Sequence, residues 1–234
     1  MQRKKKFLAT TRAYLKLVFH LFKVFWQLLR GIWRLSYLSS APVTIFGGSN
    51  LPPDSIYLKK AKELATMLSK HKIPVLTGGG PGIMEAATCG AANKSKKVIS
   101  TIGIGVKGLS EIEGFNKCAK NTIVMDNFSS RKWLLTSYSS GFAVFPGGFG
   151  TLDELTGLLT LIQTKMRVKA PIVLIGVDYW KPFVDWLIHS ALAEGLVKKE
   201  DVALFILTDD IQQAFDLLYD NAKKYEFSVF EVQR

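Results

Sequence analysis

Three glycine-rich segments are the residues of this sequence best suited to chemistry. They are Gly47-Gly48-Ser49-Asn50, Gly78-Gly79-Gly80-Pro81-Gly82 and Pro146-Gly147-Gly148-Phe149-Gly150-Thr151. Glycine alone is a weak signal, because tight turns use it to reach positive φ without any ligand. Three clusters, each following a β-rich run, are harder to explain as turns alone. Because free amides at helix starts bind phosphate groups, the segments predict a site for a phosphorylated ligand.

Missing motifs narrow the choice of ligand. The chain has no GxxxxGK[ST] segment, which excludes a P-loop for nucleoside triphosphates. Gly78-x-Gly80 lacks the full dinucleotide fingerprint, and no acidic residue ends the next strand to hold the ribose of NAD. A mononucleotide with a single phosphate fits the segments better than a dinucleotide.

The elements that must position these loops alternate between strand and helix from Ala41 onward. The expected strands cover residues 43–46, 74–77, 98–104, 122–125, 142–145, 172–175 and 205–207. The expected helices cover residues 55–70, 84–93, 132–139, 152–165, 181–193 and 211–224. Such alternation is typical of a parallel sheet, and apolar runs such as IVLI indicate a sheet covered on both faces. The expected fold class is α/β, a doubly wound Rossmann-like parallel sheet with helices on both faces.

The segment Phe145-Pro-Gly-Gly-Phe-Gly-Thr-Leu-Asp-Glu154 follows an Arg131-Lys132 pair and Gly78-Gly-Gly-Pro-Gly-Ile-Met-Glu85. Together these motifs resemble the Lonely Guy family of nucleoside 5'-monophosphate phosphoribohydrolases, over residues 43–220. The resemblance implies hydrolysis of the N-glycosidic bond of AMP or an N6-modified AMP to free base and ribose 5-phosphate. It further implies a homodimer and no cofactor. Members are sometimes labelled lysine decarboxylases, but no lysine stands out here as a Schiff-base former. The alternative is a non-catalytic carrier or sensor of a nucleotide or pterin-type cofactor on the same fold.

The resemblance implies that Arg131 and Glu154 are the catalytic pair. A carboxylate near C1' can stabilise oxocarbenium character on the ribose and orient the attacking water, as in glycoside hydrolysis. An arginine near the base favours the electron-rich leaving group. The expected substrate-binding residues are Gly47, Ser49, Gly79, Gly80, Gly82, Glu85, Lys132, Pro146, Gly147, Gly148, Gly150 and Thr151.

Individual roles within this set follow from residue type. The amides of residues 147–151, with the Thr151 hydroxyl, are expected to anchor the 5'-phosphate, and Glu85 is expected to contact the ribose. Lys132 either assists with the phosphate or is solvated. Asp126, at a strand end, is a weaker candidate.

The catalytic pair also has plainer structural interpretations. Thr151-Leu152-Asp153-Glu154 fits a capping box, in which Glu154 caps a helix start. Arg131 follows Ser129 and Ser130, the expected caps of the next helix, so it could be a surface cation in a first turn. The macrodipole disfavours a cation there by up to ~1 kcal/mol, and a broken local rule hints at function.

The formal charge of +12 is concentrated at the N-terminus. The first acidic residue is Asp54, and nine cations precede Leu38: Arg3, Lys4, Lys5, Lys6, Arg12, Lys16, Lys23, Arg30 and Arg34. Taking these nine from +12 leaves +3 for the rest of the chain. A nearly neutral body with a basic arm argues against nucleic acid as a partner and for an arm that meets an anionic surface.

Between Phe7 and Leu38 the polar residues recur at helical steps of three or four: Arg12, Lys16, His20, Lys23, Gln27, Arg30 and Arg34. This spacing predicts an amphipathic helix, with residues 1–40 forming an arm and residues 41–234 a nucleotide-binding catalytic domain. Within residues 7–38, no stretch free of Lys and Arg exceeds six residues. A helix that spans a membrane needs ~20 mostly apolar residues, so the arm is not expected to cross one. The protein is expected to be cytoplasmic, with the arm lying on the inner face of the membrane. Alternatively, the apolar face of the arm packs against the body or a second subunit.

The cysteines and histidines do not indicate a metal site. Cys89 and Cys118 lack CxxC spacing and are expected to be thiols in a reducing cytosol. The three histidines, His20, His71 and His189, are scattered. No bound metal is expected.

Overall fold

The computed structural model describes residues 2–92, 99–109 and 116–224, with backbone only for residues 2–9. Three parts of the sequence-based expectations lie outside the described residues. These are Val98 of the expected strand 98–104, Asn93 of the expected helix 84–93, and residues 225–234 of the expected domain 41–234.

Seven parallel strands form one sheet in the order β4-β3-β2-β1-β5-β6-β7. Their bounds are β1 Val43–Phe46, β2 Val75–Thr77, β3 Thr101–Val106, β4 Thr122–Met125, β5 Gly141–Val144, β6 Ile172–Ile175 and β7 Phe205–Thr208. After β4 the chain crosses back, so that β5 pairs with the free side of β1. The expected α/β fold class is confirmed. The strand order reverses between β1 and β5, where ligands of such sheets bind beyond the strands' carboxyl ends.

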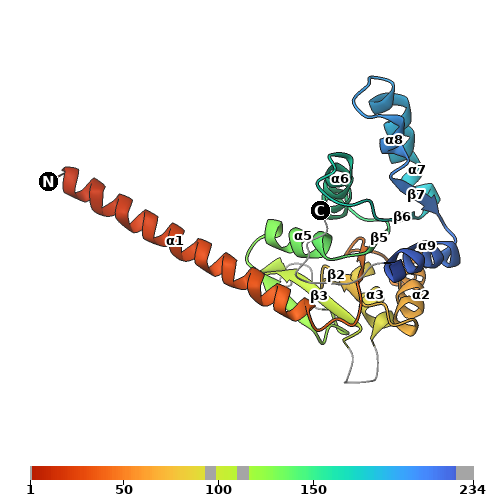
Figure 1. Ribbon diagram of the computed structural model, residues 1–234, viewed down its shortest axis with the longest axis horizontal. Helices are drawn as coiled ribbons and strands as arrows, with labels where there is room; N and C mark the ends of the chain where they lie inside the picture. The colour runs from red at the N-terminus through yellow and green to blue at the C-terminus, as the bar shows by residue number, and fades with distance from the viewer. Residues whose placement is uncertain (1, 93–98, 110–115, 225–234) are drawn as a thin grey trace.

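Alternate side chains along each strand enter two apolar cores, one on each face of the sheet. Val43 and Ile45 of β1 enter the core shared with α2 (Ile56–Lys70), α3 (Ile83–Ala91) and α9 (Ile211–Lys224). Phe46 enters the opposite core, shared with α5 (Phe128–Ser137), α6 (Phe149–Gln163) and the end of α1 (Gln2–Leu35). The helices therefore cover both faces of the sheet (Figure 1).

Helix α5 begins at Phe128, four residues before the expected start at residue 132. Asn127 caps it, because its side chain accepts a hydrogen bond from the Ser130 amide at 2.9 Å. The expectation that Ser129 and Ser130 cap this helix is wrong. Apolar periodicity marks the buried apolar positions of a helix, whereas the first turn of α5 contains the polar residues Ser129, Ser130 and Arg131.

Helices α6 and α7 also begin earlier than expected. α6 begins at Phe149 rather than at residue 152, and Gly148 is its N-cap. α7 (Val177–Trp186) begins before residue 181 and continues as a π-helix, η1 (Leu187–Leu192), before the short α8 (Lys199–Val202). Residues 149–151 therefore belong to the helix that carries Glu154.

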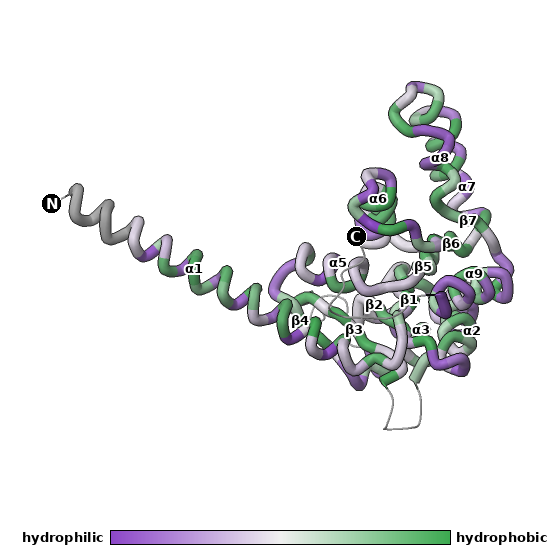
Figure 2. The backbone as a smooth tube through the Cα atoms, in the orientation of Figure 1, coloured by the Kyte–Doolittle hydropathy of each residue, from purple (hydrophilic) through white to green (hydrophobic). Residues whose placement is uncertain are grey.

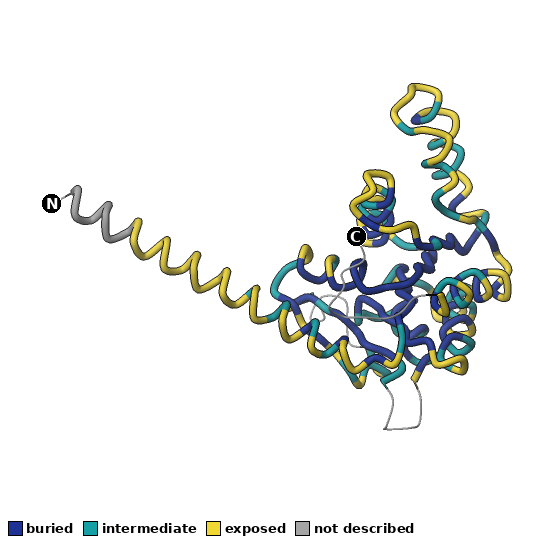
Figure 3. The backbone as a smooth tube through the Cα atoms, in the orientation of Figure 1, coloured by how far each residue is buried: buried dark blue, intermediate teal, exposed yellow. Residues whose placement is uncertain are grey.

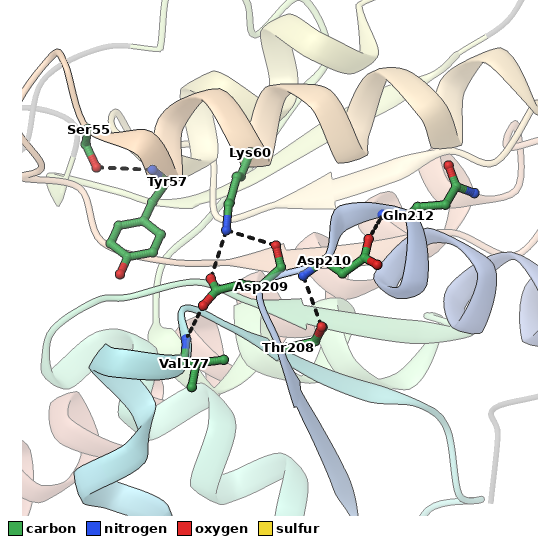
Figure 4. A network of polar contacts seen from close by, with 8 residues as sticks. All are labelled: Ser55, Tyr57, Lys60, Val177, Thr208, Asp209, Asp210 and Gln212. Carbon is green, nitrogen blue, oxygen red and sulfur yellow. Dashed lines mark hydrogen bonds and ion pairs between the residues drawn. The ribbon is translucent and has the colours of Figure 1, made fainter.

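Polar contacts at the ends of β6 and β7 fix where α7 and α9 begin (Figure 4). The Asp209 carboxylate accepts a hydrogen bond from the Val177 amide at 3.1 Å and pairs with Lys60 Nζ at 2.8 Å. The Lys60 hydrogen bond holds the pKa of Asp209 below its usual range. The Asp210 carboxylate accepts from the Gln212 amide at 2.8 Å. Both helix starts are thereby tied to the carboxyl edge of the sheet.

Cys89 of α3 and Cys118, in the segment before β4, form a disulfide with Cα atoms 5.1 Å apart. The expectation of two free thiols is wrong. Tertiary packing brings these segments together, since the Asn116 side-chain amide donates to the Thr88 hydroxyl and to the Gly80 carbonyl, both at 3.2 Å. The expectation of a reducing compartment rested on free thiols and loses that support.

The N-terminal arm is a helix, α1, as expected, and the part that reaches the body is its C-terminal end (Figure 1). Its amphipathic character stays a prediction. Leu35 and Leu38 are buried in the core beneath α5. Gly31 lies so close to Leu134 of α5 that a Cβ would approach its Cδ1 to 2.6 Å. None of the helices in the described residues is both long and apolar enough to cross a bilayer. The division at residue 40 stays a prediction, although the end of α1 shares the body's core.

Leu35→Ala should therefore lower the free energy of unfolding by about 2–5 kcal/mol, because Leu35 is fully buried. Leu15→Ala is the control: the same change in the same helix, where the side chain is 65% exposed, should cost less than about 0.5 kcal/mol. Urea unfolding followed by circular dichroism measures both. Equally small effects would mean that the end of α1 does not belong to the core.

Candidate active site

A cavity of about 370 Å³ lies at the point where the strand order reverses. Its lining comes from the segments after β1, β3 and β5, from the first turns of α3 and α5, and from the first two turns of α6. The lining residues are Phe46, Gly47, Gly48, Ser49, Met84, Leu109, Phe128, Arg131, Gly148, Phe149, Gly150, Thr151, Asp153 and Glu154. The structure thus brings seven of the expected site residues together: Gly47, Ser49, Arg131, Gly148, Gly150, Thr151 and Glu154.

The glycine loops pack backbone against backbone beside this cavity. The Gly48 amide donates to the Pro146 carbonyl at 2.9 Å, and the Ile83 amide donates to the Gly48 carbonyl at 3.0 Å. A Cβ at Gly147 would lie 2.7 Å from the Gly48 nitrogen. A Cβ at Gly82, where φ is +65°, would collide with the Gly48 oxygen. Pro146, Gly147 and Gly82 therefore hold the loops together from behind the cavity lining.

Gly148 and Gly150, by contrast, have no local reason to be glycine. A Cβ at either position would meet open space, and neither residue has a positive φ. Both lie at the start of α6, where first-turn amides lack partners within the helix. Glycine at these positions leaves the amides open to close approach, which is what an anion such as phosphate requires.

Helix α5 places Arg131 at the cavity in a buried position, only 9% exposed. The interpretation of Arg131 as a surface cation in a first turn is wrong. Its guanidinium lies against Gly78 in the loop after β2, where any Cβ would collide with it. Its Cζ lies 5.8 Å from the centroid of the Phe128 ring. Gly78 therefore provides the space that the guanidinium occupies beside the cavity.

Glu154 lies in the second turn of α6, not at its start. The helix begins at Phe149, so Thr151 is its third residue and the expected capping box is wrong. The Glu154 side chain is 5% exposed, and within the described residues its Oε2 has no hydrogen-bond partner. A buried carboxylate oxygen without a partner costs free energy, so its retention beside a cavity points to a functional role.

Burial raises the pKa of Glu154 above its usual range, although the nearby charges of Arg131 and Lys132 lower it. Because the pKa is raised in the folded state, the folded protein loses stability as the pH rises through that pKa and the carboxylate ionises. A carboxylate with raised proton affinity is suited to accept a proton from water near neutral pH.

Lys132 lies behind the cavity lining. Its Nζ pairs with the Asp153 carboxylate at 2.9 Å and donates to the Asp153 carbonyl at 2.6 Å. Lys132 is therefore ion-paired at a partly exposed position, and its expected role with the phosphate stays a prediction. The contact joins α5 to α6, the two helices that carry Arg131 and Glu154.

Three further expected residues, Gly79, Gly80 and Glu85, lie outside the cavity lining. Glu85 is in the first turn of α3, as expected, and is partly exposed. Gly79 has a φ of +77°, which explains its glycine by backbone conformation alone. Asp126 pairs with Lys23 of α1 at 2.6 Å and takes no part in the lining.

Sequence reasoning missed the apolar side chains of the cavity: Phe46, Met84, Leu109, Phe128 and Phe149. Phe149 directly follows Gly147 and Gly148, and its side chain is 92% exposed, which is unusual for a large apolar residue. Phe128 and Phe149 are each the first residue of a helix at the carboxyl edge. An aromatic residue at such a helix start is a signal that could have placed both at the site.

No set of three His, Cys, Asp or Glu side chains within residues 2–92, 99–109 and 116–224 could hold a metal ion.

The fold and cavity define a class: a doubly wound α/β protein with a cradle of helix-start amides and a buried arginine and glutamate beyond the sheet's carboxyl edge. The family model described as "Possible lysine decarboxylase" matches residues 84–218, more than half of the chain. The chain belongs to this family.

Named relatives confirm the resemblance to the Lonely Guy proteins. "Probable cytokinin riboside 5'-monophosphate phosphoribohydrolase LOGL2" of Oryza sativa subsp. japonica is 27% identical over 186 residues, which cover 79% of this chain and 74% of that protein. The cytokinin riboside 5'-monophosphate phosphoribohydrolase LOG2 of Arabidopsis thaliana is 25% identical, covering 79% and 85%. The pyrimidine/purine nucleotide 5'-monophosphate nucleosidase of Escherichia coli is 27% identical, covering 73% of this chain but 40% of that longer protein.

Solved structures share the fold. The molybdenum cofactor carrier protein of Chlamydomonas reinhardtii has a TM-score of 0.54 at 21% identity, covering 78% of this chain and 98% of that one. The molybdenum cofactor binding protein of Rippkaea orientalis has a TM-score of 0.55 at 19% identity, covering 78% and 98%. At these identities the likeness shows the fold alone.

Gly150→Ala should test the cradle at the start of α6. The melting temperature should stay the same or rise, because the Cβ meets open space and alanine is favoured over glycine in a helix by about 1 kcal/mol. Affinity for inorganic phosphate should fall by about tenfold, since the methyl group obstructs approach to the amides. Calorimetric titration with phosphate, with chloride at equal ionic strength as control, measures the loss. Undiminished phosphate binding would place the anion elsewhere.

Proposed function

We propose that this chain hydrolyses the N-glycosidic bond of nucleoside 5'-monophosphates, releasing a free base and ribose 5-phosphate. The single observation that carries the proposal is the buried Glu154 carboxylate, with an oxygen lacking a partner among the described residues, in a cavity that also contains the Arg131 guanidinium. The names of the relatives support the same reaction class.

In the proposed mechanism Glu154 faces C1' of the ribose. As the C1'–N bond breaks, its electron pair leaves with the base and positive charge develops on the ribose, which the Glu154 carboxylate stabilises. Water then bonds to C1' and gives one proton to the Glu154 carboxylate. Glu154 releases this proton to solvent before the next turnover, while the departing base anion takes up one proton from solvent. Arg131 stabilises the negative charge that develops on the departing base. One water is consumed, and the base carries away one proton.

The cradle at the start of α6 would bind the 5'-phosphate. The amides near Gly148 and Gly150 and the Thr151 hydroxyl lie at the positive end of a 15-residue helix, which favours an anion. Binding energy from this distant group can be used to position the reacting bond. Lys132 would contribute indirectly, by holding α5 against α6 through Asp153.

Within this class we propose a purine nucleotide, AMP or an N6-modified AMP, as substrate. The support is the similarity to cytokinin riboside 5'-monophosphate phosphoribohydrolases over 79% of the chain. The rings of Phe128 and Phe149 offer apolar surface on which a base can stack. The homodimer implied by the resemblance stays a prediction, which light scattering would check.

A carrier of a nucleotide or pterin-type cofactor is the alternative on this fold. The molybdenum cofactor proteins with the same fold give it no more than architectural support. A carrier has no use for a buried carboxylate of raised pKa facing its ligand, because ionising that group opposes folding. Tight binding of AMP without release of adenine would favour the carrier.

AMP should release adenine and ribose 5-phosphate, whereas adenosine should react at least about a hundredfold more slowly in kcat/KM. The reason is that adenosine lacks the phosphate through which the cradle positions the reacting bond. Separation of products by liquid chromatography measures both rates, with inosine, cytidine and guanosine monophosphates included to report base preference. Equal rates on AMP and adenosine would contradict the cradle, and no free base from any of them would contradict the reaction.

Glu154→Gln should lower turnover by a factor on the order of 10² to 10⁴, because an amide cannot stabilise the ribose cation or accept the proton of water. In the native protein kcat/KM should fall toward acid pH with a midpoint above the 4.5 of an ordinary glutamate. The variant should lack that acid limb.

Although Glu154→Gln should lose turnover, it should not lose thermal stability. Above the raised pKa, Glu154→Gln should melt at the same temperature as the native protein or higher, because it removes a buried charge. The difference should shrink as the pH falls and Glu154 protonates. Glu63→Gln, the same chemical change at an exposed position of α2, is the control and should alter neither quantity. A folded, fully active Glu154→Gln protein would exclude the catalytic role.

A further inference from the structure

Helix α1 leaves a long apolar face without a partner among the described residues. The helix has 34 residues, roughly 50 Å at ~1.5 Å per residue, and projects from the body with most of its described length exposed (Figures 1 and 3). One line of side chains at steps of three or four is 42–65% exposed: Leu15, Val18, Phe22, Trp26, Leu29 and Trp33. Figure 2 shows hydrophobic residues recurring along the described part of the helix, alternating with hydrophilic ones. An exposed apolar face of this length marks an interaction surface.

The body is attached to the opposite side of α1. Gly31 and Leu35 contact the body. Each lies two positions after a member of the exposed line, Leu29 or Trp33, and two positions on an α-helix are about 200° apart, so they lie on opposite sides of the helix. Near them, Gln27 Oε1 accepts from the Asp126 amide at 3.1 Å. The hydrogen bond from Lys23 to Asp126 holds the pKa of that carboxyl below its usual range. The contacts with the body therefore leave the aromatic face pointing away from it.

Charge distinguishes between two candidate partners for this face, a second copy of the chain and a lipid surface. Nine cations and no acidic residue precede Leu38, and four of the cations lie within residues 3–6. A second copy would bring the same cations to a shared helix interface, and the rest of the chain, at +3, offers no excess of negative charge to meet them. An anionic lipid surface supplies negative charge next to apolar depth, which matches a helix with both features.

We propose that α1 lies in the interface of an anionic bilayer, with Phe22, Trp26 and Trp33 inserted among the lipids and the catalytic body held on the water side. Tryptophan is favoured at the boundary between headgroups and acyl chains. Arg12 and Arg30 border the inserted face on the helix, where their long side chains can reach the headgroup phosphates. The geometry places the body opposite the inserted face, so binding leaves the cavity at the edge of the sheet accessible.

The test is flotation of the full-length protein with vesicles of phosphatidylcholine, with or without phosphatidylglycerol. The protein should float with the anionic vesicles, and at least about tenfold less with neutral vesicles or in high salt. A Phe22→Asp/Trp26→Asp variant should lose about tenfold or more of the binding and unfold at the same urea concentration as the native protein. The control is Met166→Asp/Leu196→Asp, the same kind of change at side chains 70% and 76% exposed outside α1. It should float like the native protein.

Light scattering of the same variants distinguishes lipid from a second copy. A Phe22→Asp/Trp26→Asp protein of unchanged mass that no longer floats supports the proposal. The proposal is overturned if the native protein stays in the soluble fraction, if the variant floats as well as the native protein, or if the variant loses mass because α1 joined two copies. Hydrolysis of AMP by the variant in solution should be unchanged, so a failure here is separable from a failure of the proposed activity.

Discussion

The close approach of two loops on neighbouring strands determines much of this structure. β1 and β5 are adjacent only because the chain crosses back over the sheet after β4, and the Gly48 amide then bonds to the Pro146 carbonyl at 2.9 Å. Any side chain at Gly147 would separate the two loops. The glycines at these positions serve backbone packing, and that packing in turn opens the cavity and presents the start of α6 to it. The Tyr179 hydroxyl, which donates to the Gly147 carbonyl at 2.5 Å, adds support from α7.

On this framework the structure retains groups that oppose folding. The Glu154 carboxylate is buried with one oxygen unpartnered among the described residues, and burial raises its pKa. The Arg131 guanidinium is buried against Gly78, the one residue type that leaves room for it. Phe149 is 92% exposed at the cavity. Such features also occur singly elsewhere in the described chain, as at the buried Arg167 and the exposed Leu196, but here all three lie at one cavity, as expected where a site is kept for its chemistry.

The sequence predicted most strands and the starts of α2, α3 and α9 closely, but it displaced β3 by three residues at its start and began α5, α6 and α7 too late. Strands such as 43–46, 122–125 and 172–175 are short apolar runs, and their bounds agree with the structure. Helix starts depend on caps, and Asn127 and Gly148 lie outside the apolar periodicity that located α5 and α6. The capping-box interpretation of Glu154 failed for this reason. The Cys89–Cys118 disulfide depends on how α3 meets a distant segment, which spacing along the chain does not encode.

Arg131 and α1 are linked through α5, although they were assigned to different parts of the chain. The C-terminal end of α5 is held by the buried Arg167, whose guanidinium donates to the carbonyls of Thr136 and Ser139, the latter at 2.5 Å. The N-terminal cap, Asn127, directly follows Asp126, which Lys23 and Gln27 of α1 bind. The middle of α5 packs against Gly31 through Leu134. Helix α1 thus supports the element that places Arg131 in the cavity, because it contacts α5 along its side and just before its cap. An arm that only extended from the body would need none of these contacts, so the end of α1 is part of the frame that positions the site.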